Sequence, residues 1–189
     1  LCSTQMLVPF LGLVFVAGLY GDTAHLLPLL GLSGAILGFL FFNLRSPWRK
    51  RANVFLGDAG SSFLGLVLAW FLIDMSQGRE AVMQPVSALW FAMLVTYSAV
   101  EIIVRRVLSK RSPLKPDREH LHHVFLLAGF SVSETVWTMS VIALIGVVIG
   151  ILGTILAVPH SILFGSFVLM GLLFLGFILR TWRAMQFLH

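Results

Sequence analysis

The sequence predicts an all-α, polytopic transmembrane helix bundle with about six membrane helices and both chain ends in the cytoplasm. Three observations lead to this prediction. The composition is 58% hydrophobic and only 11% charged, with a mean hydropathy of +0.96, whereas soluble domains are roughly 45–50% apolar and about 25% charged. The apolar residues form separate runs, most of them close to the ~20 residues that cross a bilayer. Nearly all Lys and Arg residues fall on alternate connections between these runs.

The membrane helices are expected at 6–20, 26–44, 61–75, 86–104, 136–158 and 162–179. No soluble domain fits between these runs, so residues 1–189 are expected to form a single transmembrane domain, the C-terminal portion of a longer polypeptide. Two pairs of glycines, Gly34 with Gly38 and Gly146 with Gly150, have the G-x-x-x-G spacing that lets membrane helices approach closely. We therefore expect both pairs to lie at helix contacts.

The basic residues predict the orientation of the bundle. They lie in 45–51, 105–118 and 180–183, and Arg79 alone falls on the other side. By the positive-inside rule these segments are cytoplasmic. The connections 21–25, 76–85 and 159–160 are then external and carry few candidate functional residues, and Asp74 is expected simply to reach the interface. We expect the chemistry in two cytoplasmic segments, 45–60 and 105–134.

The first cytoplasmic segment leads to an aspartate at the start of an apolar helix. Asp58 lies between Gly57 and Gly60 in the stretch 53–65. A carboxylate at the membrane edge is costly without a partner. A divalent cation and phosphates are fitting partners here, because glycines let a ligand approach the backbone and a helix N-terminus attracts anions. The alternative is that Asp58 is a plain N-cap.

The second cytoplasmic segment, 109–124, is rich in histidine. Pro113 and Pro116 keep its first half out of a helix, and Asp117 can then cap a short amphipathic helix. This helix would carry Arg118, His120, His122 and His123. A guanidinium fork and imidazole donors suit anion binding. Zinc binding is an alternative, but neither H-E-x-x-H nor a cysteine cluster is present. For the basic residues before Pro113, contact with anionic lipid head groups is the simpler interpretation.

Together, these motifs resemble those of a known family. The stretch 54–61, Val-Phe-Leu-Gly-Asp-Ala-Gly-Ser, is similar to the metal-binding aspartate motif of the polyprenyl-phosphate N-acetylhexosamine-1-phosphate transferases, members of glycosyltransferase family 4. The stretch 112–123, Ser-Pro-Leu-Lys-Pro-Asp-Arg-Glu-His-Leu-His-His, is similar to the histidine loop of the same family. The nearest branch is the bacterial undecaprenyl-phosphate N-acetylglucosamine-1-phosphate transferases.

The resemblance implies a reaction and a set of site residues. A membrane polyprenyl phosphate would receive GlcNAc-1-phosphate, or a related sugar phosphate, from a UDP-N-acetylhexosamine with release of UMP. This would be the first step of a lipid-linked cell-envelope glycan, such as the O-antigen, on the cytoplasmic face of the bacterial inner membrane. Asp58 would bind Mg²⁺ or Mn²⁺, and His122 and His123 would be catalytic. Substrate would be held by Arg118, His120, Asn53 and Gly60. The implied partners are the UDP-sugar, the lipid and the membrane; a homodimer is left open, and no nucleic acid is expected.

Two features set this chain apart from the family pattern. The aspartate pair and the Asn- and Asp-rich motif of the family's earlier half are absent from this sequence. The family's aspartate before the histidine loop corresponds to a position near Ser98, and Glu101 is a candidate substitute that we also expect to pair with Arg105 at i+4. The alternative function is therefore a truncated, non-catalytic membrane bundle of the same family. A transporter is disfavoured because the middles of the apolar runs lack ionisable residues.

Overall fold

The computed structural model describes residues 2–43, 54, 56–78, 80–109, 125–126 and 129–186, with side chains described through residue 181. All regular structure in this part of the chain is helical: α1 (Cys2–Tyr20), α2 (Thr23–Asn43), α3 (Gly57–Asp74), α4 (Pro85–Phe91), α5 (Met93–Leu108), α7 (Val132–Ile155) and α8 (His160–Gln186). Five of these helices are long and apolar enough to cross a membrane, or six spans if α4 and α5 are taken as one bent span. The all-α, multi-pass prediction is confirmed.

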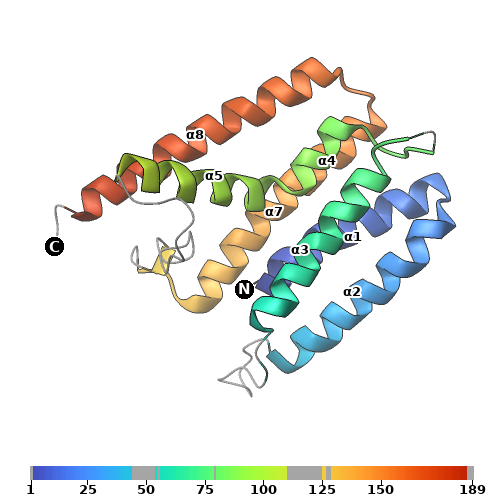
Figure 1. The fold of residues 1–189 in the computed structure, drawn as a ribbon, viewed down its shortest axis with the longest axis horizontal. Coiled ribbons are helices and arrows are strands. Elements are labelled where there is room, and N and C mark those ends of the chain that lie inside the picture. Colours follow the sequence, from blue (N-terminus) through green and yellow to red (C-terminus); the bar gives the residue numbers. More distant parts are fainter. Residues whose placement is uncertain are drawn as a thin grey trace.

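The helices run back and forth between two ends of an elongated bundle (Figure 1). α1 packs against α2, α3 and α7, while α4 packs against α7 and α8. The short connections after α1, α3 and α7 gather at one end, and the start of α1, the end of α2, the start of α3 and the end of α8 lie toward the other. This arrangement agrees with the alternation that the basic residues predict. The cytoplasmic location of the two chain ends stays a prediction.

The core lies where α1 crosses its neighbours. Phe10 and Leu13 of α1 and Leu29 of α2 are fully buried, and they pack in one cluster with Phe71 of α3 and Val147 of α7. Large apolar side chains also cover the outside of the bundle, including Leu27, Phe41, Trp137 and Phe177 at 67–73% exposure. An apolar outer surface of this kind is suited to lipid rather than to water.

One of the two predicted glycine contacts is confirmed. A Cβ atom at Gly146 would lie 2.7 Å from the backbone oxygen of Trp90, and one at Gly150 would lie 2.8 Å from the ring of Phe91. The backbones of α4 and α7 can therefore approach only because these positions lack side chains. The prediction for the other pair is wrong within the described residues: Gly34 and Gly38 are exposed, and nothing lies within 4 Å of a Cβ at either position.

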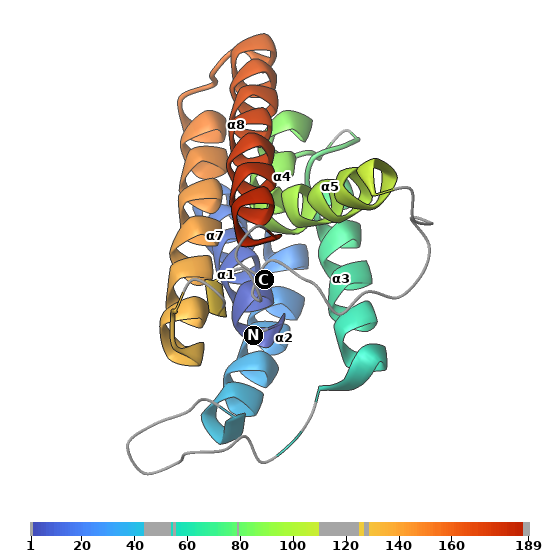
Figure 2. The same cartoon turned by 90° about the vertical axis from the view of Figure 1, so that its left-hand side faces the viewer.

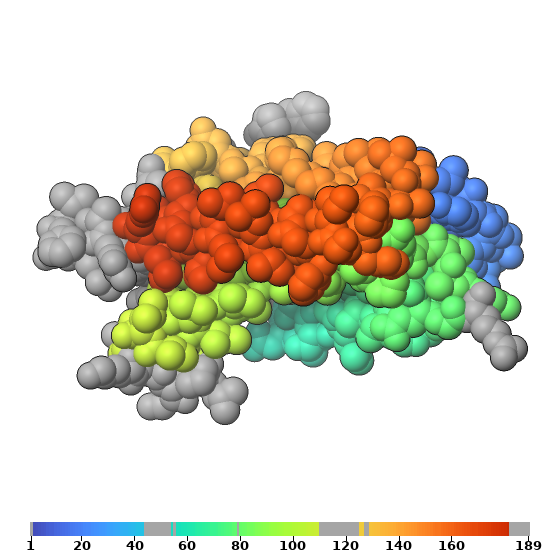
Figure 3. Space-filling view, turned by 90° about the horizontal axis from the view of Figure 1, so that it is seen from above, coloured from blue at the N-terminus to red at the C-terminus, as the bar shows by residue number. Residues whose placement is uncertain are grey.

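The predicted single helix over 86–104 is wrong, because it is broken at Ala92. The axes of α4 and α5 differ by 74°, and α5 projects sideways from the bundle (Figure 2). Contacts with α8 on both sides of the break account for the bend. The indole of Trp90 in α4 donates to the carbonyl of Leu163 (3.3 Å), and the hydroxyl of Tyr97 in α5 donates to the carbonyl of Phe167 (2.5 Å). Figure 3 shows α8 lying along α5 over this region.

The start of α7 also differs from the prediction, by four residues. The helix begins at Val132 because Ser131 and Glu134 form a capping box. The backbone N–H of Ser131 donates to the Glu134 carboxylate (2.7 Å), and the N–H of Glu134 donates to the Ser131 hydroxyl (3.3 Å). The spacing Ser-x-x-Glu is a recognised helix-start signal, whereas the apolar run that was used for the prediction begins only one turn later.

Candidate active site at the start of α3

Asp58 lies in the first turn of α3, at the end of the bundle where α2 ends. Gly57, the first helical residue, has φ = +71°, a left-handed conformation that glycine adopts without steric cost. The residue before the helix, Leu56, is in the helical region and offers no side-chain cap. The N-cap alternative for Asp58 is therefore wrong: the residue is inside the helix, one position after its first residue.

The carboxylate of Asp58 is exposed and available to a ligand. Among the described residues, no group bonds to it; the hydroxyl of Ser61 donates instead to the backbone carbonyl of Asp58 (3.0 Å). The free N–H groups of the first helical turn add a partial positive charge at the same place, which favours anions. An exposed carboxylate next to free N–H groups can bind a cation and an anion side by side, as a metal-phosphate complex requires.

Gly60 serves packing at this helix start. A Cβ atom at this position would lie 2.9 Å from Cγ and Cδ1 of Leu56. Any larger residue would displace Leu56, whose side chain packs against the main core cluster. The glycine thus lets the chain fold back tightly onto α3 just before Asp58. Its predicted contact with substrate stays a prediction.

A hydrogen bond joins the chain ahead of Asp58 to the end of α2. The backbone N–H of Val54 donates to the side-chain oxygen of Asn43 (2.9 Å), whose amide nitrogen donates in turn to the carbonyl of Phe39 (2.9 Å). The last turn of α2 and the approach to α3 are therefore held together although 11 residues separate them in sequence. Asn53, predicted to bind substrate, lies just outside the described residues.

The second predicted half of the site falls outside the described part of the chain. Arg118, His120, His122 and His123 are among the residues whose structure is not described, so their roles stay predictions. The helix that leads to them, α5, carries the predicted pair of Glu101 and Arg105, and the pair is confirmed: Arg105 Nε donates to Glu101 Oε1 (3.1 Å). The carboxylate of Glu101 is almost fully buried, at 1% exposure.

The fit of a divalent cation to this site can be judged from the donor set. Within the described residues, no three acidic, histidine or cysteine side chains are close enough to hold a metal ion by themselves. Asp58 can supply a single carboxylate. Mg²⁺ is commonly bound by one or two carboxylates, with water and substrate phosphates completing its octahedron. The exposed carboxylate, which has no partner among the described residues, fits this mode better than a metal cage built of protein ligands alone.

The fold and site define a class: a multi-pass helical membrane protein with an exposed carboxylate at a helix start. Residues 1–76, which include Asp58, match the family described as glycosyl transferase family 4. The chain is 34% identical over 155 residues to the undecaprenyl-phosphate alpha-N-acetylglucosaminyl 1-phosphate transferase of Pasteurella multocida, covering 82% of this chain and 43% of that protein. The protein of the same name from Escherichia coli K12 is 31% identical over 182 residues, covering 96% of this chain and 49% of the relative.

These matches confirm the resemblance to glycosyl transferase family 4 that the motifs predicted. The relative from Haemophilus influenzae, with the same name, gives a similar match: 34% identity over 155 residues, 82% of this chain and 44% of the relative. The chain thus spans a little under half the length of the curated relatives it matches. No solved structure matches the chain significantly.

The structure also shows a polar network that the sequence does not predict. Asp22, His25 and Asp74 are bonded to one another at the opposite end of the bundle from Asp58. A partial signal for this network is present in the sequence, because Asp22 lies directly before a helix and His25 follows three residues later. The partner Asp74, however, is 49 residues away from His25, and local spacing gives no indication of it.

Proposed function

We propose that this chain forms part of a transferase that moves N-acetylhexosamine-1-phosphate, and specifically GlcNAc-1-phosphate, from a UDP-sugar to a membrane polyprenyl phosphate. Overall, a bond forms between an oxygen of the lipid phosphate and the β-phosphorus of the UDP-sugar. The bond from that phosphorus to the bridging oxygen breaks, and UMP leaves with this oxygen. The relatives' name, which specifies undecaprenyl phosphate and N-acetylglucosaminyl 1-phosphate, supports these substrates. The product would begin a lipid-linked glycan of the bacterial cell envelope, made at the cytoplasmic face of the inner membrane.

The observation that carries the proposal is the position of Asp58. Its carboxylate is exposed at the N-terminus of a membrane helix, without a partner among the described residues and inside the segment that matches the family. Asp58 would hold Mg²⁺ or Mn²⁺ there. The bound cation would neutralise charge on the pyrophosphate as two anionic substrates are brought together.

The remaining roles in this proposal go to the first turn of α3 and to residues of the two motifs. The first-turn N–H groups of α3 would orient a phosphate oxygen beside Asp58. Arg118 and His120 would bind phosphate through charge-assisted hydrogen bonds. His122 and His123 would hold or donate a proton at the reacting phosphate, and Asn53 and Gly60 would border the bound substrate.

The proposal is tested by changing the carboxylate of Asp58 to an amide. Removal of a residue that only hydrogen-bonds to a metal ligand typically lowers metal affinity or activity by about 10–100-fold. Asp58→Asn, which changes a proposed ligand itself, should therefore reduce UMP release by at least about 100-fold. It should also weaken Mn²⁺ binding measured by electron paramagnetic resonance. The matched control is Glu80→Gln, which makes the same chemical change in an exposed carboxylate of the connection between α3 and α4. Full transfer activity in Asp58→Asn, with membrane insertion intact in both variants, would exclude Asp58 from the reaction.

A further inference from the structure

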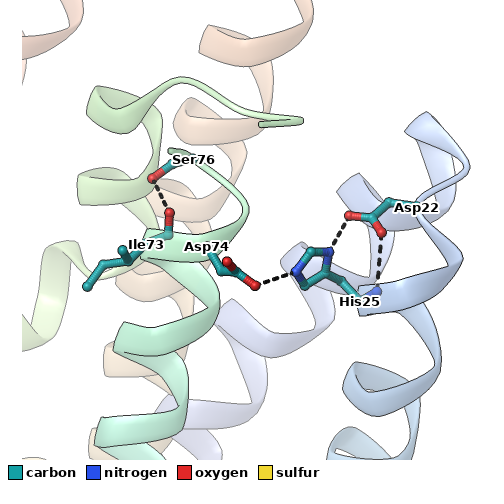
Figure 4. A network of polar contacts seen from close by, with 5 residues as sticks. All are labelled: Asp22, His25, Ile73, Asp74 and Ser76. Carbon is teal, nitrogen blue, oxygen red and sulfur yellow. Dashed lines mark hydrogen bonds and ion pairs between the residues drawn. The ribbon is translucent and has the colours of Figure 1, made fainter. Parts of the chain in front are cut away.

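A three-residue polar network joins α2 to α3 at the end of the bundle opposite Asp58 (Figure 4). Asp22 precedes α2 and accepts from the backbone N–H of His25 through Oδ1 (3.2 Å), while its Oδ2 lies 2.5 Å from His25 Nδ1. The other ring nitrogen of His25, Nε2, lies 2.9 Å from Oδ2 of Asp74, the last residue of α3. The side chains of His25 and Asp22 are 18% and 13% exposed, and that of Asp74 is half exposed.

The two carboxylates fix the orientation of the His25 ring. An ionised carboxylate can only accept hydrogen bonds, so an imidazole that faces one on each side bonds to both only when both ring nitrogens carry a proton. Asp22 fixes the orientation of the ring from within its own helix turn, and the ring then presents Nε2 to Asp74. Phe71, one turn before Asp74, packs edge-on against the same ring (centroids 6.1 Å apart). Asp22 and Phe71 thus hold the ring so that Nε2 faces Asp74.

Apolar packing between α2 and α3 is incomplete over part of their length. Toward the Asp58 end, an apolar pocket of about 200 Å³ lies between them, bordered by Leu32, Ile36, Phe39, Gly60 and Phe63, among others. Side chains that leave such a space do not interlock, so they do not fix the position of one helix along the other. Two polar links join α2 to α3 or to the chain just before it: the network at one end and the hydrogen bond between Asn43 and Val54 at the other.

The end of α3 that carries Asp74 is also hydrogen-bonded to the chain just before α4. The backbone carbonyl of Met75, directly after α3, accepts from the N–H groups of Val82 (2.9 Å) and Met83 (3.2 Å). These bonds hold α3 and the approach to α4 as one unit. The link from His25 to Asp74 therefore connects this unit to the α1–α2 pair.

We propose that His25 is a positioning residue: by bridging Asp22 and Asp74, it fixes α3 along α2 and so places Asp58 at the opposite end of α3. An α-helix rises about 1.5 Å per residue, so Asp58 and Asp74 are about 24 Å apart on one stiff rod. Because the helix is stiff, a shift of α3 along its axis at Asp74 would shift Asp58 by the same amount. Catalytic and metal-binding groups must be held within about 0.5 Å of their working geometry, so a small slip matters. The link to catalysis rests on the proposed function of Asp58.

The experiment measures placement and activity separately, in the full chain as it occurs in the cell, reconstituted into lipid nanodiscs. Spin labels at Phe41 in α2 and Ala59 in α3, both exposed, report the distance between the two helices at the Asp58 end once Cys2 and any further cysteine of the full chain are replaced by serine. His25→Phe removes both ring bonds, and His25→Gln is a milder change that keeps one donor. The matched control is His160→Phe, an exposed histidine at the start of α8.

We expect His25→Phe to shift or broaden the label distance, and His160→Phe to leave it unchanged. The Mg²⁺ concentration for half-maximal transfer should rise about two- to thirtyfold, the range typical of residues that act on a site from a distance. Exchanging the partners (His25→Asp with Asp74→His) restores a histidine–carboxylate pair between α2 and α3 and should move both values back toward those of the native protein. A rescue of this kind would not follow from a general loss of stability.

Two results would overturn the proposal. The first is a label distance that is the same in the native protein, His25→Phe and His25→Gln. The second is a changed distance with an unchanged Mg²⁺ requirement, while Asp58→Asn is inactive. A changed distance together with a fully active Asp58→Asn would instead refute the proposed function of Asp58. In that case the placement of α3 by His25 would stand on the distance alone.

Discussion

The hydroxyl of Tyr97 allows a direct test of the contact between α5 and α8. It is buried and donates to the carbonyl of Phe167 in α8 at 2.5 Å, while its ring packs 4.9 Å from the ring of Phe167 and 5.7 Å from that of Phe174. Tyr97→Phe removes the hydroxyl and keeps both ring contacts. The carbonyl of Phe167 lies within a helix and keeps its backbone partner there, so no acceptor is left unpaired. The loss should equal one net hydrogen bond, about 0.5–1.5 kcal/mol.

Chemical unfolding in mixed micelles, followed by circular dichroism, measures this loss, and hydrogen exchange locates it. The free energy of unfolding should fall by about 1 kcal/mol in Tyr97→Phe, with faster exchange concentrated in α5. The chain has two tyrosines, and the other one supplies the control: Tyr20 is 48% exposed and bonds to no described residue through its hydroxyl. Tyr20→Phe should change stability by less than about 0.5 kcal/mol. Equal effects of the two substitutions would refute the idea that the Tyr97 bond holds α5 on α8.

Two further predictions concern helix packing and capping. Gly150→Ala would place a Cβ atom 2.8 Å from Phe91 and should destabilise the protein by about 1–3 kcal/mol. Gly34→Ala, where nothing lies within 4 Å of the new Cβ atom, should be neutral or slightly stabilising. The reverse order of the two effects in the same unfolding assay would contradict the α4–α7 contact. Ser131→Ala removes the cap of α7 and should lower the free energy of unfolding by about 1 kcal/mol. Ser133→Ala, two residues on and exposed, should lower it by less than about 0.5 kcal/mol. Equal losses would argue against the capping box.

The sequence predicts the helical class and most of the membrane spans because these depend on local composition. Long apolar runs can satisfy their backbone groups in lipid only as helices, so five of the six expected runs correspond to single long helices. The break at Ala92 has no such local signal: neither proline nor glycine lies next to it. Its cause is contact with α8 through Trp90 and Tyr97, whose partners are 73 and 70 residues away. Periodicity within one run carries no information about such partners.

The candidate site was predictable to a similar degree. The placement of Asp58 at the start of a helix follows from the two flanking glycines and the apolar run behind it, and the structure confirms it. That Asp58 lies inside the helix rather than at its cap depends on Leu56, whose side chain folds back over Gly60. An apolar residue before a helix gives no capping signal, so the sequence left this point open. The pairing of Glu101 with Arg105 was predictable because it is local, at i+4.

The way the helices are joined explains why a few polar bonds matter here. Between apolar helices in lipid, water supplies no driving force, and close packing and hydrogen bonds must fix their positions. The α4–α7 contact has close packing, because Gly146 and Gly150 bring the two backbones together. The seam between α2 and α3 has an apolar pocket instead. Among the described residues, no close glycine contact between α2 and α3 shares the role of the bond between His25 and Asp74. We accordingly expect the position of α3, and of Asp58 with it, to be more sensitive to a change at His25 than α4 is to the loss of any single bond to α8.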